Sequence, residues 1–240
     1  SGFEGVNSTG HNNVFFSPDL FPMVQLDFRD FYQTLAGCQN CVGQFNHPGD
    51  EDHQTWAGFE YHVDADEKMH LFEFNGAGPA WDLLFDALDQ GWHVSPMFNQ
   101  DNHSADWGTA NDHRSGFFLE NLSVASIRQA MLERRSFMTE DKNAVIEMKA
   151  QGSCWMGSIL GGVQTLQLTA TVTDEDSGDG FETIEFYGPT QTLLDSCACN
   201  GLTTCSCSYE TDITADTYVL TRAIQLDGDR LVSSPIWAAP

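Results

Sequence analysis

Five histidine and carboxylate side chains in the first 103 residues are of the types that bind transition metals. Asp101 and His103 form an Asp-x-His pair, which can place a carboxylate oxygen and an imidazole nitrogen on one cation. Glu4, His11 and His47 precede this pair, and each stands where an expected strand meets a loop. Because imidazole and carboxylate together suit Zn, Mn or Fe, these residues indicate a site for a divalent transition metal.

Two further segments have residue types suited to ligand binding. His113 and Arg114 are the best candidates for substrate contact near the Asp-x-His pair, and a solvated loop is the alternative interpretation. The acidic segment that begins at Asp174 faintly resembles a calcium loop. It lacks glycine at the sixth position and a bidentate glutamate at the twelfth, so a solvated hairpin turn is favoured there.

The cysteines indicate cross-links rather than catalysis. Asn200-Gly201, a strong turn signal, lies between two Cys-x-Cys pairs. In a hairpin, Cys197 with Cys207 and Cys199 with Cys205 have the same index sum, so one register faces both pairs on one side. Disulfides are favoured over a four-thiolate zinc site, for which Cys-x-Cys spacing is poor. Cys38 and Cys41 are expected to close a small disulfide loop, and Cys154 is left over, either free and buried or paired outside this chain.

The elements that must position the candidate ligands mix strands and helices. Val42–Asn46 and His70–Asn75 have the composition of short buried strands. Trp81–Gln90 carries an apolar stripe at helical spacing and is closed by a glycine, while Ser123–Arg135 begins with a serine cap and ends in arginines. This alternation predicts an α/β domain over residues 1–160.

The pattern changes after Gly161-Gly162. Apolar and polar residues alternate over Leu166–Thr173, and further short strand-like segments follow with turn residues between them and no helical period. These segments are Thr183–Tyr187, the cysteine hairpin, Tyr218–Leu226 and Leu231–Trp237. Residues 161–240 are therefore predicted to form a small all-β sandwich of immunoglobulin-like size.

The order of the motifs before residue 160 resembles one known family. They run, in order, Glu4, Gly10-His11-Asn12-Asn13, Asn46-His47-Pro48, Glu73-Phe74-Asn75-Gly76, Trp81–Leu84, Gly91–Val94, Asp101–His103, Arg135–Asp141 and Met156–Ser158. This series is similar to the PHP (polymerase and histidinol phosphatase) superfamily, in its secreted CehA/McbA-like branch. Family members open with a His-x-His strand before the glutamate, and this chain starts three residues before Glu4.

The resemblance implies a fold and a chemistry. The fold would be α/β, a PHP-type distorted (β/α)7 barrel that is incomplete at its N-terminus. Two or three divalent ions (Zn, Mn or Fe) would be held by Glu4, His11, His47, Asp101 and His103, with Glu4 bridging two of them, and Glu4, His47 and Asp101 would be catalytic. These ions would activate water and neutralise a phosphoryl group, so the reaction expected is hydrolysis of a small-molecule phosphate ester.

Composition excludes several classes of partner. The 240 residues include 10 Lys plus Arg against 35 Asp plus Glu, a formal net charge of -25. So acidic a chain repels phosphate backbones, which argues against nucleic-acid binding. No apolar run reaches the roughly 18 to 20 residues of a membrane-spanning helix. The cysteine framework favours an oxidising compartment, so a secreted, extracellular or periplasmic protein is expected.

Three functions follow as hypotheses. The first is a secreted metal-dependent phosphoesterase. The second is a catalytically inactive PHP scaffold that serves as an extracellular binding or filament component. The third is hydrolysis of a non-phosphate ester or amide. The chain begins Ser1-Gly2 without methionine, which indicates a processed product or a fragment, so another segment or chain is expected to lie beside residues 1–16 and supply the missing histidines.

Overall fold

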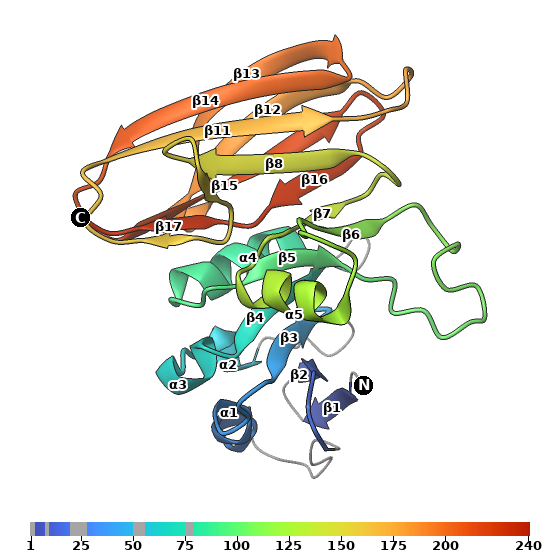
Figure 1. The fold of residues 1–240 in the computed structure, drawn as a ribbon, viewed down its shortest axis with the longest axis vertical. Helices are drawn as coiled ribbons and strands as arrows, with labels where there is room; N and C mark the ends of the chain where they lie inside the picture. Colours follow the sequence, from blue (N-terminus) through green and yellow to red (C-terminus); the bar gives the residue numbers. More distant parts are fainter. Residues whose placement is uncertain (1–2, 8–9, 20–27, 50–55, 75–78) are drawn as a thin grey trace. The chain divides into compact units, whose positions relative to one another are not determined.

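The computed structural model describes residues 3–7, 10–19, 28–49, 56–74 and 79–240 (Figure 1). The chain divides into two compact units. The first unit comprises Ser1–Val94 with Leu119–Leu132, and the second comprises Ser95–Phe118 with Glu133–Pro240. By this division, residues 95–118 and 133–160, which were expected in the first domain, belong to the second unit.

The first unit is built on a sheet with the strand order β1-β2-β3-β4. The pairs β1–β2 and β2–β3 are antiparallel, and β3–β4 is parallel. The strands are β1 (Phe3–Asn7), β2 (Gly10–Phe15), β3 (Val42–Asn46) and β4 (Met69–Phe74), and the helices are α1 (Phe28–Ala36), α2 (Trp56–Phe59), α3 (Val63–Asp66), α4 (Ala80–Asp89) and α5 (Val124–Leu132). None of the helices in the described ranges is long and apolar enough to cross a bilayer.

Aromatic side chains form the core of this unit. Phe45 on β3 packs edge-on against Trp92, with ring centroids 5.2 Å apart, and Tyr32 on α1 lies 5.2 Å from the same indole. The Trp92 Nε1–H donates to the carbonyl of Phe59 at 2.8 Å, so the buried indole keeps a hydrogen-bond partner. Every residue of β3 and β4 is buried, which agrees with the short buried strands predicted there.

The predicted (β/α)7 barrel is wrong. Such a barrel needs parallel strands that alternate with crossover helices, whereas in this sheet β1 pairs antiparallel with β2 and β2 pairs antiparallel with β3. Strands predominate in the chain as a whole, and its helices are short. The β3–β4 pair has the parallel pairing of an α/β unit, whereas the barrel itself was implied by the family resemblance.

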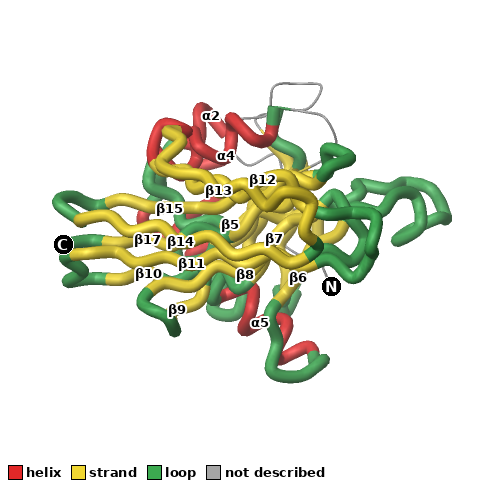
Figure 2. Tube along the Cα trace, turned by 90° about the horizontal axis from the view of Figure 1, so that it is seen from above, coloured by secondary structure: helices red, strands yellow, loops and turns green. Residues whose placement is uncertain are grey.

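The second unit consists mainly of two sheets (Figures 1 and 2). One has the order β10-β17-β15-β16-β7-β6, and β12 joins β15 to β13; the other has the order β14-β11-β8-β9. The strands are β5 (Ser95–Phe98), β6 (Arg114–Phe117), β7 (Ser136–Thr139), β8 (Val145–Ala150), β9 (Cys154–Trp155), β10 (Ile159–Leu160), β11 (Thr165–Thr173), β12 (Phe181–Gly188), β13 (Thr192–Leu202), β14 (Thr204–Asp212), β15 (Thr217–Gln225), β16 (Arg230–Ser233) and β17 (Ile236–Ala238), and η1 (Pro189–Gln191) is a 3-10 turn.

Alternation along these strands forms the core between the sheets. On β11, Leu166, Leu168, Ala170 and Val172 are buried, while most of the Thr and Gln residues between them are exposed. Because successive side chains of a strand point to opposite faces, this period places one apolar row against the other sheet. The core also holds Ile146, Met148, Phe181, Ile184, Phe186 and Val219. The β-sandwich predicted from the alternation is present, but its two sheets also contain strands from before residue 161, namely β6, β7, β8, β9 and β10.

The three predicted disulfides are present, and Cys154 is a half-buried free thiol. The hairpin around them differs from the prediction. Asn200 and Gly201 both have positive φ, 55° and 77°, but they form a bulge within β13 rather than the turn. The chain reverses after Leu202 and passes from one sheet to the other, because β13 pairs with β12 and β14 pairs with β11. The Cys197–Cys207 and Cys199–Cys205 disulfides therefore join the two sheets.

Candidate functional site

His11 and His47 lie together in the first unit. His11 is on β2, and its antiparallel partner in the register is Asn46, the last residue of β3, so His47 follows directly at the strand end. The His11 Nδ1 and His47 Nε2 atoms are 3.1 Å apart, and the two rings meet edge to face at 84°. His47 is 5% exposed and His11 is half-buried. Two of the predicted ligands, 36 residues apart in the chain, thus form a pair.

Buried polar groups hold the chain at this pair. The backbone N–H of His47 donates to Glu73 Oε2 on β4 at 3.0 Å, and Glu73 is 2% exposed. The Asn46 amide oxygen accepts the N–H of Asn13 at 3.1 Å and the Gln44 Nε2–H at 3.0 Å. Glu73 was predicted only as part of the Glu73–Gly76 motif, with no role of its own. A carboxylate in an otherwise apolar strand is the signal that would have marked it as a buried partner of the site.

The pair fits one transition-metal ion. Two imidazole nitrogens bound to a tetrahedral zinc at about 2.05 Å would lie about 3.3 Å apart. The 3.1 Å separation of His11 Nδ1 and His47 Nε2 is close to that value. It is also the length of a hydrogen bond in which one ring donates its N–H to the other. Two imidazole donors suit the predicted Zn, Mn or Fe.

Glu4, the predicted bridging ligand, is on β1. Its backbone lies opposite Asn13 of β2 in the antiparallel register, two residues along the strand from His11. The side chain of Glu4 lies outside the described residues. Its role as a ligand stays a prediction.

Asp101 and His103 belong to the second unit, in the loop that follows β5. The His103 Nε2 and Asp101 Oδ1 atoms are 3.3 Å apart. The His103 side chain is 84% exposed and that of Asp101 is 31% exposed, so this predicted Asp-x-His pair is formed at the surface of its unit.

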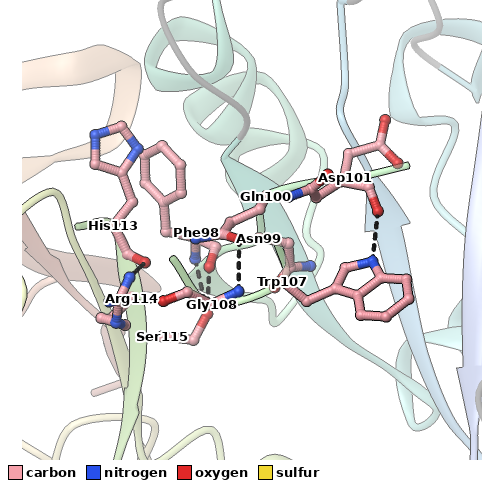
Figure 3. A pocket seen from close by; sticks show the side chains of 10 residues that line it. Phe98, Asn99, Gln100, Asp101, Trp107, Gly108, His113, Arg114 and Ser115 are labelled. Atoms are coloured by element: carbon pink, nitrogen blue, oxygen red, sulfur yellow. Dashed lines mark hydrogen bonds between the residues drawn. The ribbon is translucent and has the colours of Figure 1, made fainter. Parts of the chain in front are cut away.

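Asp101 also lines a cavity of about 360 Å³ within the second unit (Figure 3). Trp107 and Asp101 lie at one end of the cavity, and the His113 ring stands beside the Phe98 ring at the other, with centroids 4.1 Å apart. The cavity is also lined by Asn99, Gln100, Asn102, Gly108, Arg114 and Ser115. The structure thus brings Asp101, His113 and Arg114, three residues predicted at the site, to one cavity.

Arg114 makes hydrogen bonds to the loop itself. Its Nη1 donates to the carbonyls of Asn111 at 2.9 Å and His113 at 2.7 Å, and its Nη2 donates to that of Gly108 at 3.1 Å. These bonds engage donors that would otherwise bind an anion. The guanidinium therefore braces the loop, and its predicted contact with substrate stays a prediction.

Comparison with known proteins adds no family. No family model matches the chain, and no curated protein is similar to it. Among solved structures, it is similar to fibronectin(III)-like modules of Clostridium thermocellum CbhA, at 18% identity over 38% of this chain and 93% of that chain, with a TM-score of 0.26. A lytic polysaccharide monooxygenase of Jonesia denitrificans is 15% identical over 37% of this chain and 62% of that chain, with a TM-score of 0.27. An engineered protein is 10% identical over 82% of this chain and 55% of its own, with a TM-score of 0.28. At these TM-scores the likenesses assign neither a fold family nor an activity.

Proposed function

We propose that this protein binds a divalent transition metal through His11 and His47 and hydrolyses a phosphate ester. The observation that carries the proposal is the 3.1 Å approach of the two imidazole nitrogens, which suits two ligands of one ion. The resemblance of the ordered motifs to those of PHP enzymes adds the reaction class. The proposal does not require a closed barrel, because the pair is formed by two adjacent antiparallel strands.

The residues of the first unit have distinct roles in this proposal. His11 and His47 bind the ion, and Glu73 fixes the backbone of His47 by accepting its N–H, which orients a ligand from outside the coordination sphere. A bound ion supplies a water of lowered pKa and positive charge for the phosphoryl oxygens. The family resemblance adds Glu4 of β1 as a further ligand in the first unit, and it makes Asp101 and His103 the candidate ligands of the second unit.

The setting proposed for this activity is outside the cell or in the periplasm. The three disulfides are of the kind that persists in oxidising compartments. Among the described strands, β1 pairs only with β2, so its other edge can accept a further strand. We place the proposed additional segment, from this protein or another chain, at that edge, where it would add histidines to the site.

Metal binding is tested with paired histidine variants. Purified protein is stripped of metal, loaded with Zn²⁺ or Mn²⁺ and analysed for metal content and affinity. His11→Ala and His47→Ala are each expected to weaken binding by at least about tenfold, because each removes a ligand. His62→Ala is the matched control, since His62 is a half-buried histidine of the same unit whose ring lies beside that of Tyr32. Equal metal affinity in His11→Ala, His62→Ala and the unmodified chain would refute the site.

Hydrolysis is tested on the metal-loaded protein with a phosphomonoester, a phosphodiester and a carboxylic ester. Turnover of a phosphate ester that is lost in His47→Ala supports the proposal. Turnover of the carboxylic ester alone would replace it with the third hypothesis of ester or amide hydrolysis. Metal binding with no turnover would favour the inactive binding or structural component, which agrees with the engagement of the Arg114 donors by backbone carbonyls.

A further inference from the structure

Trp107 presents a large aromatic surface to solvent in the loop between β5 and β6. The residue is 72% exposed, and its Nε1–H donates to the carbonyl of Asn102 at 2.9 Å, which fixes the indole. A single exposed apolar side chain is ordinary on a protein surface. This one, however, lines the cavity of about 360 Å³ in the second unit. Its ring face is therefore available to a ligand of that cavity.

Hydrogen bonds hold the loop on both sides of Trp107. Before it in the chain, Asp106 Oδ1 accepts a hydrogen bond from Asn102 Nδ2 at 2.9 Å. After it, the N–H of Gly108 donates to Gln100 Oε1 at 3.1 Å. Because both chain neighbours of Trp107 are held, a ligand that contacts the indole meets a surface already in position, which lowers the entropy lost on binding.

Asp101 supplies a negative charge at the same end of the cavity as Trp107 (Figure 3). Its Oδ1 lies 3.3 Å from Nε2 of His103, whose side chain is 84% exposed. No Lys or Arg in the part of the chain that the structure describes forms an ion pair with Asp101. A carboxylate without a permanently charged partner, close to an aromatic face, suits a positively charged ligand.

Several other polar groups of the cavity are engaged by the protein itself. Gln100 uses both ends of its amide, since its Nε2 donates to Asn111 Oδ1 at 2.8 Å. The Ser115 hydroxyl donates to the carbonyl of Phe98 at 2.8 Å and accepts the N–H of the same residue at 3.0 Å. Arg114 donates to three backbone carbonyls. The one guanidinium among the lining residues is thus already bound to oxygens, which favours a cation over an anion as the ligand.

The charge around the cavity favours the same class of ligand. Residues 98–115 contain Asp101, Asp106 and Asp112 against one arginine, Arg114. The whole chain has a formal net charge of -25. Such a field attracts cations and repels anions before they reach the cavity. Because the field acts on every cation alike, selection among cations depends on the aromatic face and the carboxylate that line the cavity.

We propose that this cavity binds a small organic ammonium ion, with its charged group over the Trp107 indole and beside the Asp101 carboxylate. Tryptophan attracts cations to its ring face more strongly than the other aromatic side chains do, and quaternary ammonium ions are recognised in this way. The cavity volume of about 360 Å³ lies within the range of small-molecule sites, roughly 300 to 1,000 Å³. At the other end, the Phe98 and His113 rings offer a wall for the alkyl groups (Figure 3). The site assigns Asp101 a ligand other than the metal implied by the family resemblance, and it does not depend on hydrolysis.

The test is isothermal titration calorimetry of the full chain, after chelation of metals and at constant ionic strength. The probes are choline, its uncharged isostere 3,3-dimethylbutan-1-ol, inorganic phosphate and glucose. Choline is expected to bind at least about tenfold more tightly than the isostere, because the two differ in charge and hardly in shape. The proposal is overturned if choline does not bind, if the isostere binds equally well, or if phosphate or glucose binds in place of choline.

Variants assign the binding to this cavity. Trp107→Leu removes the aromatic face and Asp101→Asn removes the charge, and each is expected to weaken choline binding at least about tenfold. Asp112→Asn is the matched control and should keep the full affinity, because the Asp112 side chain is 74% exposed and does not line the cavity. Circular dichroism shows whether each variant is folded, and Asp101→Asn decides the question if Trp107→Leu is not. Equal losses in Asp101→Asn and Asp112→Asn would show a general attraction to the acidic chain and contradict the site.

Discussion

Cys199 and Cys205 are joined by a disulfide, with Cα atoms 5.7 Å apart, although they lie on strands of different sheets. Cys199 is on β13, which pairs with β12, and Cys205 is on β14, where its ladder partner is Val172 of β11. The chain between them turns the corner from one sheet to the other. The Cys197–Cys207 disulfide repeats the link two residues further along each strand, with Cα atoms 5.9 Å apart.

These two disulfides should stabilise the sandwich because they restrict the conformations of the unfolded chain. Replacing both Cys197 and Cys207 with alanine is expected to lower the free energy of unfolding of the second unit by about 2 to 3 kcal/mol, because it releases a closed loop of the unfolded chain. Denaturant unfolding measures this loss. The double replacement of Cys38 and Cys41, a pair in the first unit with a sequence separation of 3, is the control and should leave the second unit unchanged. Equal losses from the two double variants would contradict the assignment.

The bulge at Asn200-Gly201 depends on a neighbouring glycine. A Cβ atom on Gly180 would lie 2.0 Å from the carbonyl oxygen of Gly201, a contact with backbone that no side-chain rotation can relieve. Gly180→Ala is therefore expected to cost about 1 to 3 kcal/mol in unfolding free energy, as overpacking does. Gly178→Ala in the same loop is the control, because nothing lies within 4 Å of its added Cβ. The bulge geometry would be refuted if Gly180→Ala proved as stable as Gly178→Ala.

Alkaline pH should destabilise the first unit through Tyr61. Burial raises the pKa of Tyr61 to about 12, and the charge of Asp66 and a hydrogen bond to its Oδ2, at 3.3 Å, add to the shift. An unfolded tyrosine ionises near pH 10, so between about pH 10 and 12 the unfolded state loses a proton that the folded state keeps. The protonated phenol therefore stabilises the folded state fully below about pH 10, and this stabilisation is lost as the pH rises towards 12.

Tyr61→Phe should make unfolding free energy less dependent on pH across this interval. Part of the slope should remain, because burial also raises the pKa of Tyr32. Urea unfolding at a series of alkaline pH values, together with ultraviolet difference spectra of the phenolates, measures both effects. Asp64→Asn, at an exposed residue of α3, is the control and should leave the slope unchanged. An unaltered slope in Tyr61→Phe would show that Tyr61 titrates normally.

Local patterns in the sequence predicted several elements and pairings well. The buried strand Val42–Asn46 is β3 to the residue, and the helical stripe from Trp81 corresponds to α4, Ala80–Asp89. The cysteine pairing followed from index sums, which hold for any two antiparallel strands that face each other, whether or not they share hydrogen bonds. Apolar alternation likewise showed which face of β11 is buried. All of these depend on residues close in sequence, whose relative geometry the chain itself determines.

Tertiary structure decided the rest. Asn200-Gly201 has the backbone of a turn, but Gly180 lies against it and β13 continues past the bulge, so the reversal comes after Leu202. The barrel failed because strand partners are chosen over long distances, and β1 and β2 pair antiparallel instead of joining a parallel series. Asp141 reaches Asp174 across 33 positions of the chain, and no spacing rule links them. A sequence restricts near neighbours through covalent geometry, whereas contacts between distant segments depend on which folded arrangement best offsets the entropy of closing the loops between them.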